Sequence, residues 1–134
     1  MDSYYRPTIA EISLDALEHN VRAFRRRLAN GTKLLASVKA NAYGHGAVES
    51  AKAAVSAGAD YLGVAFLDEA LQLRQGGVDA PILVLGYTPA EAFGLARRQG
   101  ITLTLYRHDQ LDAVERLSEQ GPRLKAHVKI DSGM

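Results

Sequence analysis

The sequence of 134 residues lacks cysteine, which excludes disulfide bridges and thiolate metal sites. It also lacks an excess of charge of either sign: the formal net charge is +1, so nothing indicates a nucleic-acid-binding surface. No run approaches the roughly 18 apolar residues of a membrane span, and the N-terminal segment has no apolar signal core. We therefore expect a soluble cytoplasmic protein without a membrane or nucleic-acid partner.

Short β-rich runs alternate with helical patterns along the chain. Apolar residues recur at helical spacing over 14–28, where Ser13 stands at the N-cap position and Asn30-Gly31 follows the end. Residues 8–13 are expected to form a strand. The remaining expected strands are 33–39, 61–65, 81–86, 101–106 and 124–130, and the expected helices between them are 47–57, 67–75, 89–99 and 109–120. This βα repeat indicates parallel pairing of the strands.

Two fold classes fit this repeat, a doubly wound sheet and a (β/α)8 barrel. No G-x-G-x-x-G sequence follows an expected strand, so the dinucleotide-binding form of the doubly wound sheet loses support. A complete barrel needs about 250 residues. If the fold is a barrel, this sequence is the N-terminal part of a TIM-like α/β barrel, with about five of eight strands. Such a part exposes sheet edges, and we expect it to be unstable alone.

Lysines stand at the C-terminal ends of the first and last expected barrel strands. Because side chains alternate along a strand, Lys39 lies on the face opposite Val38, and Lys129 lies on the face opposite Val128. If the valines pack under the helices, both lysines point into the barrel at its C-terminal rim. That rim is where barrels of this kind carry their active sites.

The two lysines and three nearby candidate residues also have ordinary structural interpretations. Lys39 would extend its amine from a strand end into solvent, and Lys129 would pair with Asp131 on the same face. His127 would be a satisfied core residue, Tyr43 would pack within its loop, and His45 would serve a turn.

Charges at two helix ends are expected to follow the helix dipole. Arg25, Arg26 and Arg27 lie in the last turn of the first helix, where a solvated basic face suits the negative helix end. Asp68 and Glu69 suit the first turn of their helix in the same way, and we assign no chemistry to them.

The stretch VKANAYGHG (38–46) resembles the cofactor-lysine signature of bacterial alanine racemases, which hold pyridoxal 5′-phosphate (PLP). The similarity extends in the same order and spacing to AEISLDALEHNV (10–21), AGADYLGVAFLDEALQLRQGGVDAPILVLG (57–86) and HVKIDSGM (127–134). Related PLP barrels such as amino-acid decarboxylases share the Lys-Ala-Asn triplet. The Tyr-Gly-His-Gly extension is characteristic of the racemases.

The resemblance implies two domains and a dimer. Residues 14–134 would form an incomplete PLP-binding barrel, and residues 1–13 would join a C-terminal β domain that is not in this chain. In the family, the L-face base and the groups that bind the phosphate and the substrate carboxylate lie beyond the end of this sequence. Because the family's site is shared between subunits, the resemblance also implies a homodimer.

The resemblance also implies roles for four residues. Lys39 would form the Schiff base with PLP and move the α-proton on the D-face, which requires its neutral amine and hence burial or a nearby cation. Tyr43 would hydrogen-bond the cofactor phosphate, and Leu85 would line the cofactor pocket. Lys129 is similar to a lysine that some family members carry as a carbamate, which turns a cation into an anion.

The expected function is that of a PLP-dependent isomerase that interconverts L-alanine and D-alanine and so supplies D-alanine for cell-wall peptidoglycan. The segment alone is expected to be inactive. A racemase for serine or for a broader set of amino acids is the alternative in the same class. From another class, a non-catalytic PLP-carrier barrel is disfavoured by Tyr43 and by the expected strand at 8–13. A truncated or nicked product is a further interpretation of the segment.

Overall fold

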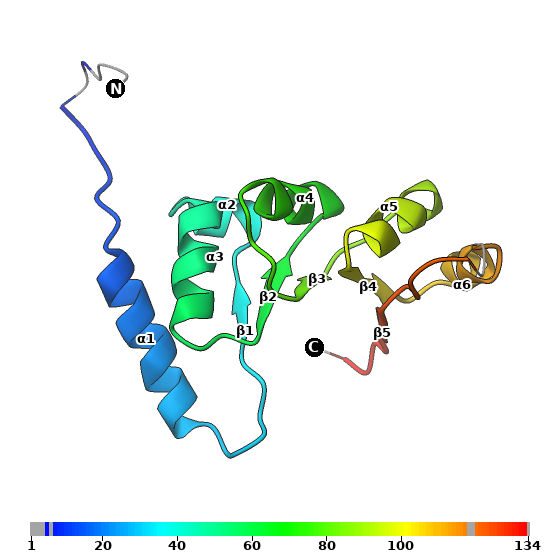
Figure 1. Cartoon of the computed structure of the whole chain (residues 1–134), viewed down its shortest axis with the longest axis horizontal. Coiled ribbons are helices and arrows are strands. Elements are labelled where there is room, and N and C mark those ends of the chain that lie inside the picture. The colour runs from blue at the N-terminus through cyan, green and yellow to red at the C-terminus, as the bar shows by residue number, and fades with distance from the viewer. Residues whose placement is uncertain (1–4, 6, 118–119, 134) are drawn as a thin grey trace.

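The computed structural model describes residues 5, 7–117 and 120–133. Within these residues helices and strands alternate along the chain (Figure 1). Their order is α1 (Leu14–Arg27), β1 (Leu35–Ser37), α2 (Lys39–Tyr43), α3 (Ala47–Ser56), β2 (Tyr61–Val64), α4 (Leu67–Gln75), β3 (Ile82–Val84), the 3₁₀ helix η1 (Ala90–Ala92), α5 (Phe93–Arg98), β4 (Ile101–Leu105), α6 (His108–Glu115) and β5 (Ala126–Val128). No helix in the described part of the chain is long and apolar enough to cross a membrane.

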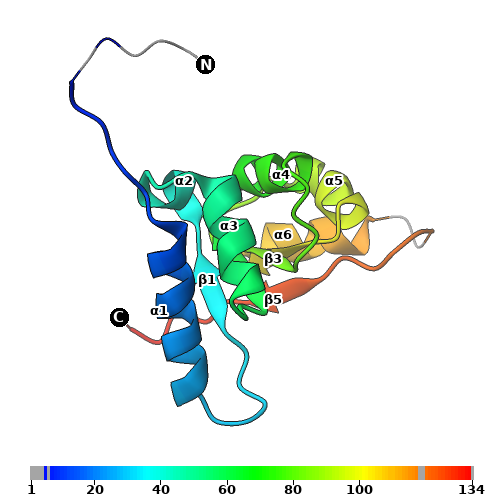
Figure 2. The same ribbon diagram turned by 60° about the vertical axis from the view of Figure 1, so that its left-hand side comes forward.

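The strands form one parallel sheet in chain order, β1-β2-β3-β4-β5. A doubly wound sheet reverses its strand order at a switch point, and this sheet does not. The helices α3, α4, α5 and α6 lie along one side of the sheet, which curves beneath them (Figures 1 and 2). This arrangement confirms the predicted N-terminal part of an α/β barrel.

The core lies between the sheet and the helices. Leu62, Ile82 and Leu103, from three successive strands, are fully buried there, and so is Phe93 at the start of α5. Val38 belongs to the same buried cluster and is only 4% exposed. Its burial meets the valine condition for the first strand, whereas Val128 of β5 is 71% exposed, because no helix follows β5 among the described residues.

The opposite face of the sheet is concave. A Cβ atom placed on Gly63 would lie 2.7 Å from Leu35 Cδ2 and 3.4 Å from Leu85 Cδ1, so these three residues share that face. Leu35 of β1 and His127 of β5 also line a common cavity of about 330 Å³, although their strands lie at opposite edges of the sheet. The concave face is therefore the interior of the unfinished barrel, and His127 faces it rather than the core.

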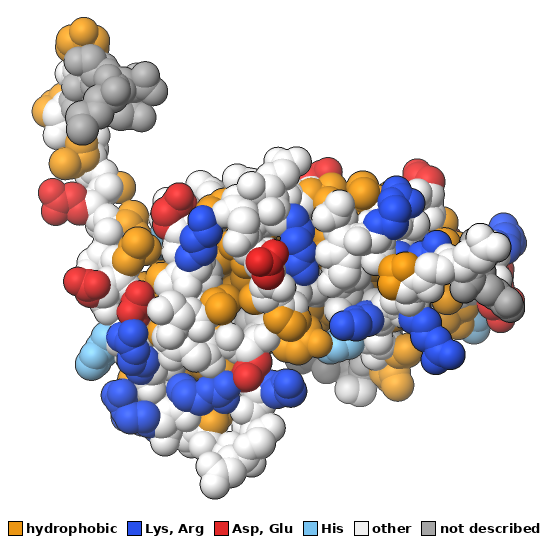
Figure 3. Space-filling model, in the orientation of Figure 1, with side chains coloured by type: hydrophobic (Ala, Val, Ile, Leu, Met, Phe, Trp, Pro, Cys, Tyr) orange, Lys and Arg blue, Asp and Glu red, His pale blue; other side chains and the backbone are white. Residues whose placement is uncertain are grey.

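The strand expected at 8–13 is not formed within this chain, and its predicted pairing with a C-terminal β domain stays a prediction. These residues lead into α1 as an arm without strand pairing, because no neighbouring strand is present among the described residues (Figures 1 and 2). Apolar side chains on the arm are exposed, among them Ile9 at 70% (Figure 3). The N-cap prediction for α1 is confirmed, since Ser13 Oγ accepts the Ala16 N–H at 3.2 Å.

Arg25 makes specific contacts at the end of α1. This corrects the prediction that all three arginines only form a solvated basic face. Its guanidinium donates to the carbonyl oxygens of Thr32 at 2.7 Å and Gly58 at 3.1 Å, and it pairs with the Asp60 carboxylate. The Leu34 N–H also donates to Asp60 and, as the main cause, holds the pKa of that carboxyl below its usual value; Arg25 adds to the effect. These contacts tie the end of α1 to the turn before β2.

Candidate functional site

The chain makes a left-handed turn directly after Lys39. Ala40, Asn41, Ala42 and Tyr43 have φ angles of +51°, +54°, +52° and +55°, although none is glycine. Each residue with a Cβ in this region costs about 1 kcal/mol or more, so such a turn persists only when its surroundings hold it. The turn reverses the chain at the end of β1 and leaves Lys39 at the C-terminal rim of the sheet.

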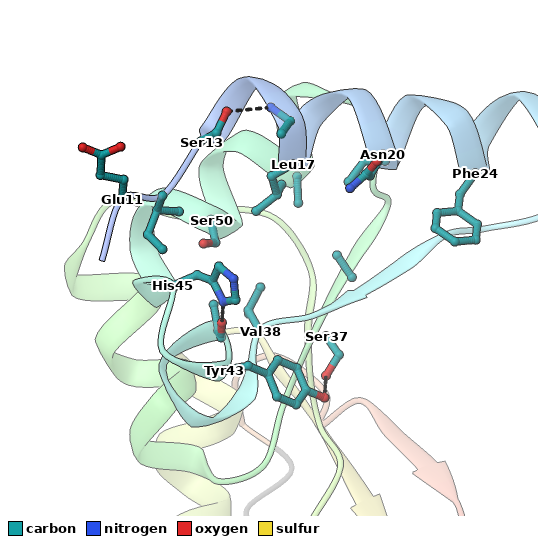
Figure 4. Close-up of a pocket in the computed structure, with 16 residues that line it drawn as sticks. Glu11, Ser13, Leu17, Asn20, Phe24, Ser37, Val38, Tyr43, His45 and Ser50 are labelled. Carbon is teal, nitrogen blue, oxygen red and sulfur yellow. Dashed lines mark hydrogen bonds between the residues drawn. The ribbon is translucent and has the colours of Figure 1, made fainter. Parts of the chain in front are cut away.

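Side chains of the VKANAYGHG stretch hold this turn from its far end. Asn41 Oδ1 accepts the Ala47 N–H at 2.8 Å and so links the turn to the start of α3. His45 Nδ1 carries its proton toward the Ala42 carbonyl oxygen at 2.8 Å, because a carbonyl can only accept (Figure 4). His45 is therefore a turn residue, as its ordinary interpretation predicted.

Glu69 holds the near end of the turn, a role that was not predicted from the sequence. Its Oε1 accepts the Ala40 N–H at 2.7 Å, and its Oε2 accepts the Ala65 and Phe66 N–H groups at 2.6 and 3.1 Å. The dipole interpretation of Glu69 is thus incomplete. The carboxylate caps α4 and also accepts a hydrogen bond from Ala40, the residue that follows Lys39.

The structure brings Lys39 and Tyr43 close together. Lys39 Nζ lies 5.9 Å from the centre of the Tyr43 ring. Tyr43 Oη lies 3.4 Å from Ser37 Oγ, so the two hydroxyl groups face each other (Figure 4). Ser37 was not singled out from sequence, although it ends β1 only two residues before Lys39.

Leu85 follows β3 and lies on the concave face, where it is 38% exposed. It supplies an apolar surface on the interior face of the sheet. A carbon chain there offers contact to a ring but no hydrogen bond. Its place in a cofactor pocket stays a prediction.

Lys129 lies on the same rim at the end of β5 but contacts a different aromatic residue. Its backbone N–H donates to the Leu105 carbonyl oxygen at 2.8 Å, and its Nζ lies 5.8 Å from the centre of the Tyr106 ring. The Asp131 carboxylate accepts the Gly133 N–H instead of pairing with Lys129. The structure thus disfavours the charge pair that was the ordinary alternative for Lys129.

A cavity of about 510 Å³ lies between α1, β1 and the turn (Figure 4). Leu17, Asn20 and Phe24 of α1 face it from one side, and Ser37 and Tyr43 face it from the other. Its lining is largely apolar and does not include Lys39. We therefore place the candidate chemistry at the rim beside Lys39, and Ser37 and Tyr43 belong both to this rim and to the lining of the cavity.

The rim residues fit the cofactor that the signature implies. A primary amine suits condensation with an aldehyde, hydroxyl groups at Ser37 and Tyr43 suit a phosphate, and Leu85 suits the face of a pyridine ring. Among the described residues, no group of three or more His, Asp or Glu side chains could hold a metal ion. The fold and site thus define the first part of a parallel α/β barrel with a lysine at the C-terminal rim of its sheet.

The chain belongs to the family described as "Alanine racemase, N-terminal domain", whose sequence model matches residues 12–134. The alanine racemase of Halalkalibacterium halodurans is 52% identical over 136 residues, which cover 100% of this chain and 35% of that protein. The chain therefore spans about a third of the length of the curated relatives that it matches.

Solved structures agree with this assignment. The alanine racemase from Bacillus anthracis with bound L-Ala-P has a TM-score of 0.91 at 41% identity, covering 99% of this chain and 34% of that one. A histidine racemase from Leuconostoc mesenteroides subsp. sake has a TM-score of 0.81 at 36% identity, covering 93% of this chain and 34% of that one. The same barrel part thus occurs in racemases named for different amino acids.

Proposed function

We propose that residues 1–134 form the N-terminal third of a PLP-dependent alanine racemase. The observation that carries the proposal is the Lys39 amine at the barrel rim beside Tyr43, within a chain about half identical to named alanine racemases. Bound PLP would supply an electron sink for the carbanion that α-proton loss creates. Lys39 would hold the cofactor covalently and move the proton on the D-face, while Tyr43 would donate to the phosphate and Leu85 would contact the ring.

The remaining parts of the site are proposed to come from outside this segment. Racemisation needs acid–base groups on both faces of the substrate carbon, and Lys39 serves only one face. A C-terminal portion of the same polypeptide and a second subunit would supply the rest, which makes the working enzyme a homodimer. The exposed arm at 8–13 would then pair with the C-terminal domain, which would cover its apolar side chains.

Conversion of L-alanine to D-alanine by the intact protein, meaning the whole polypeptide that contains residues 1–134, is the direct test. We expect conversion that requires PLP and exceeds conversion of L-serine and L-histidine, which are assayed in parallel. The histidine comparison matters because a histidine racemase has the same barrel part. Faster turnover of serine or histidine would reassign the substrate, and PLP binding without turnover of any amino acid would favour the carrier alternative.

We propose that Lys129 is carbamylated in the intact protein. Its position at the rim beside Tyr106, with Asp131 turned to the Gly133 N–H, supports the proposal, because a carbamate there is an anion able to hold a basic group of the completed site. The expected result is a mass gain of one carbon dioxide on the peptide that contains Lys129, seen by native mass spectrometry with gentle digestion. The gain should disappear in Lys129→Ala and persist in Lys125→Ala.

A further inference from the structure

The Glu69 carboxylate bridges the Lys39 turn and the end of β2. One oxygen accepts the Ala40 N–H and the other accepts the N–H groups of Ala65 and Phe66. Two of the three bonds, at 2.6 and 2.7 Å, are short as expected for an ionised acceptor. Glu69 therefore joins two rim segments that the sequence separates by more than twenty residues.

We propose that Glu69 is a positioning residue for Lys39. The bond to Ala40 N fixes the plane of the peptide that links Lys39 to Ala40, and this plane sets the direction in which the Lys39 side chain leaves the backbone. Capping of α4 needs only the bond to Phe66 N, so it leaves the bond to Ala40 unexplained. This inference rests on the proposed function of Lys39 and extends it to a residue that does not touch the cofactor.

The backbone next to Lys39 needs such a support. Ala40 is the first of four consecutive non-glycine residues with positive φ, and it is exposed. Without the carboxylate, its N–H could be satisfied by water in other conformations of the chain, and the turn would lose its restraint next to the lysine. Asn41 and His45 hold the turn only from its far side. Glu69 thus controls the orientation of the amine more directly than they do.

Two substitutions separate the parts of this role. Glu69→Gln keeps the length of the side chain but leaves only one oxygen that can accept. That oxygen cannot accept from Ala40 N–H and from the N–H groups of Ala65 and Phe66 at the same time. Glu69→Asp keeps the charge near the start of α4 but is one methylene too short to reach Ala40. Asp68→Asn is the matched control, because Asp68 lies in the same first turn and is exposed. If Glu69→Gln fails to fold, Glu69→Asp decides the question.

The test uses the cofactor-free intact protein and two probes. PLP is captured covalently by Lys39, whereas pyridoxamine 5′-phosphate has the same ring and phosphate but no aldehyde. We expect both Glu69 variants to slow covalent capture of PLP, followed by absorbance, by about tenfold. Affinity for pyridoxamine 5′-phosphate should stay unchanged, and hydrogen exchange of backbone amides in residues 39–44 should accelerate. Asp68→Asn should change none of these quantities.

The outcomes separate this inference from the proposed function. Equal weakening of both probes, unchanged capture of PLP, or unchanged exchange at 39–44 would each overturn the positioning role. If the unmodified protein binds PLP no better than Lys39→Ala does, the proposed function is wrong. Glu69 then has no cofactor-binding lysine to position. In that case the exchange result would still decide whether Glu69 holds the turn.

Discussion

Lys39→Ala in the intact protein is expected to abolish covalent retention of PLP and to lower the rate of alanine racemisation by about a thousandfold. The substitution removes the nucleophile that holds the cofactor and, in the same atom, the group that moves the proton on one face. Fold stability should change little, because Lys39 lies partly exposed at the rim and outside the buried core. The visible absorbance of the bound cofactor and the L-to-D conversion rate are the two measurements.

Lys52→Ala is the matched control for this experiment. Lys52 is an exposed lysine on α3, so its loss removes a charge and a primary amine without touching the rim. It should retain colour and activity. Borohydride reduction followed by peptide mapping should place the pyridoxyl group on Lys39 in the unmodified protein. An adduct on another lysine, or full activity of a colourless Lys39→Ala protein, would contradict the assignment.

The sequence predicted the order and type of the barrel elements well, because helix ends and buried strands have local signals. Ser13 caps α1 as predicted, and α4 spans the predicted residues 67–75. The strands are shorter than expected: β1 is Leu35–Ser37 instead of 33–39, since a strand extends only as far as its neighbour pairs with it. Residues 8–13 form no strand here for the same reason, as they have no partner among the described residues, and their pairing with a C-terminal domain stays a prediction.

Two helices differ from their predictions by more than one terminal residue. The expected helix 89–99 begins as η1 and continues as α5, which ends at Arg98. The expected helix 109–120 begins at His108 and ends at Glu115, while residues 118–119 lie outside the described part of the chain. Periodicity indicates a helical segment but does not distinguish a 3₁₀ turn from an α-helical turn, because apolar residues recur at nearly the same interval in both.

The candidate site was predictable where a residue type carries its own chemistry. Lys39 and Lys129 could be named from strand alternation, and Tyr43 and Leu85 from the resemblance to alanine racemases. The turn after Lys39 could not, because alanine and tyrosine have no preference for positive φ and only tertiary contacts impose it. Glu69 was missed because a glutamate in a first helical turn already has a sufficient local explanation. Its contact with Ala40 exists only once β1 and β2 pair.

Gly86→Ala is expected to reduce the free energy of unfolding of the intact protein by about 1–3 kcal/mol. A Cβ atom on Gly86 would lie 2.5 Å from the Ala65 carbonyl oxygen, which is backbone and cannot rotate away. That oxygen already accepts the Gly86 N–H at 3.0 Å, and the N–H of Ala65 is held by Glu69. The new methyl group must therefore separate the ends of β2 and β3.

The damage from Gly86→Ala should reach the cofactor site, because Leu85 precedes the substituted residue and Ala65 adjoins the Glu69 contacts. We expect weaker PLP binding together with the lower stability measured by chemical denaturation. Gly94→Ala is the control: a Cβ there would meet only the flexible end of Arg98, at 3.4 Å, within α5. It should stabilise the protein by about 0.5–1 kcal/mol, because alanine favours the helix. If Gly86→Ala has the same free energy of unfolding as Gly94→Ala, the ends of β2 and β3 separate without cost. The backbone of Ala65 would then not be a rigid anchor for Glu69, and the proposed support of the Lys39 turn would be contradicted.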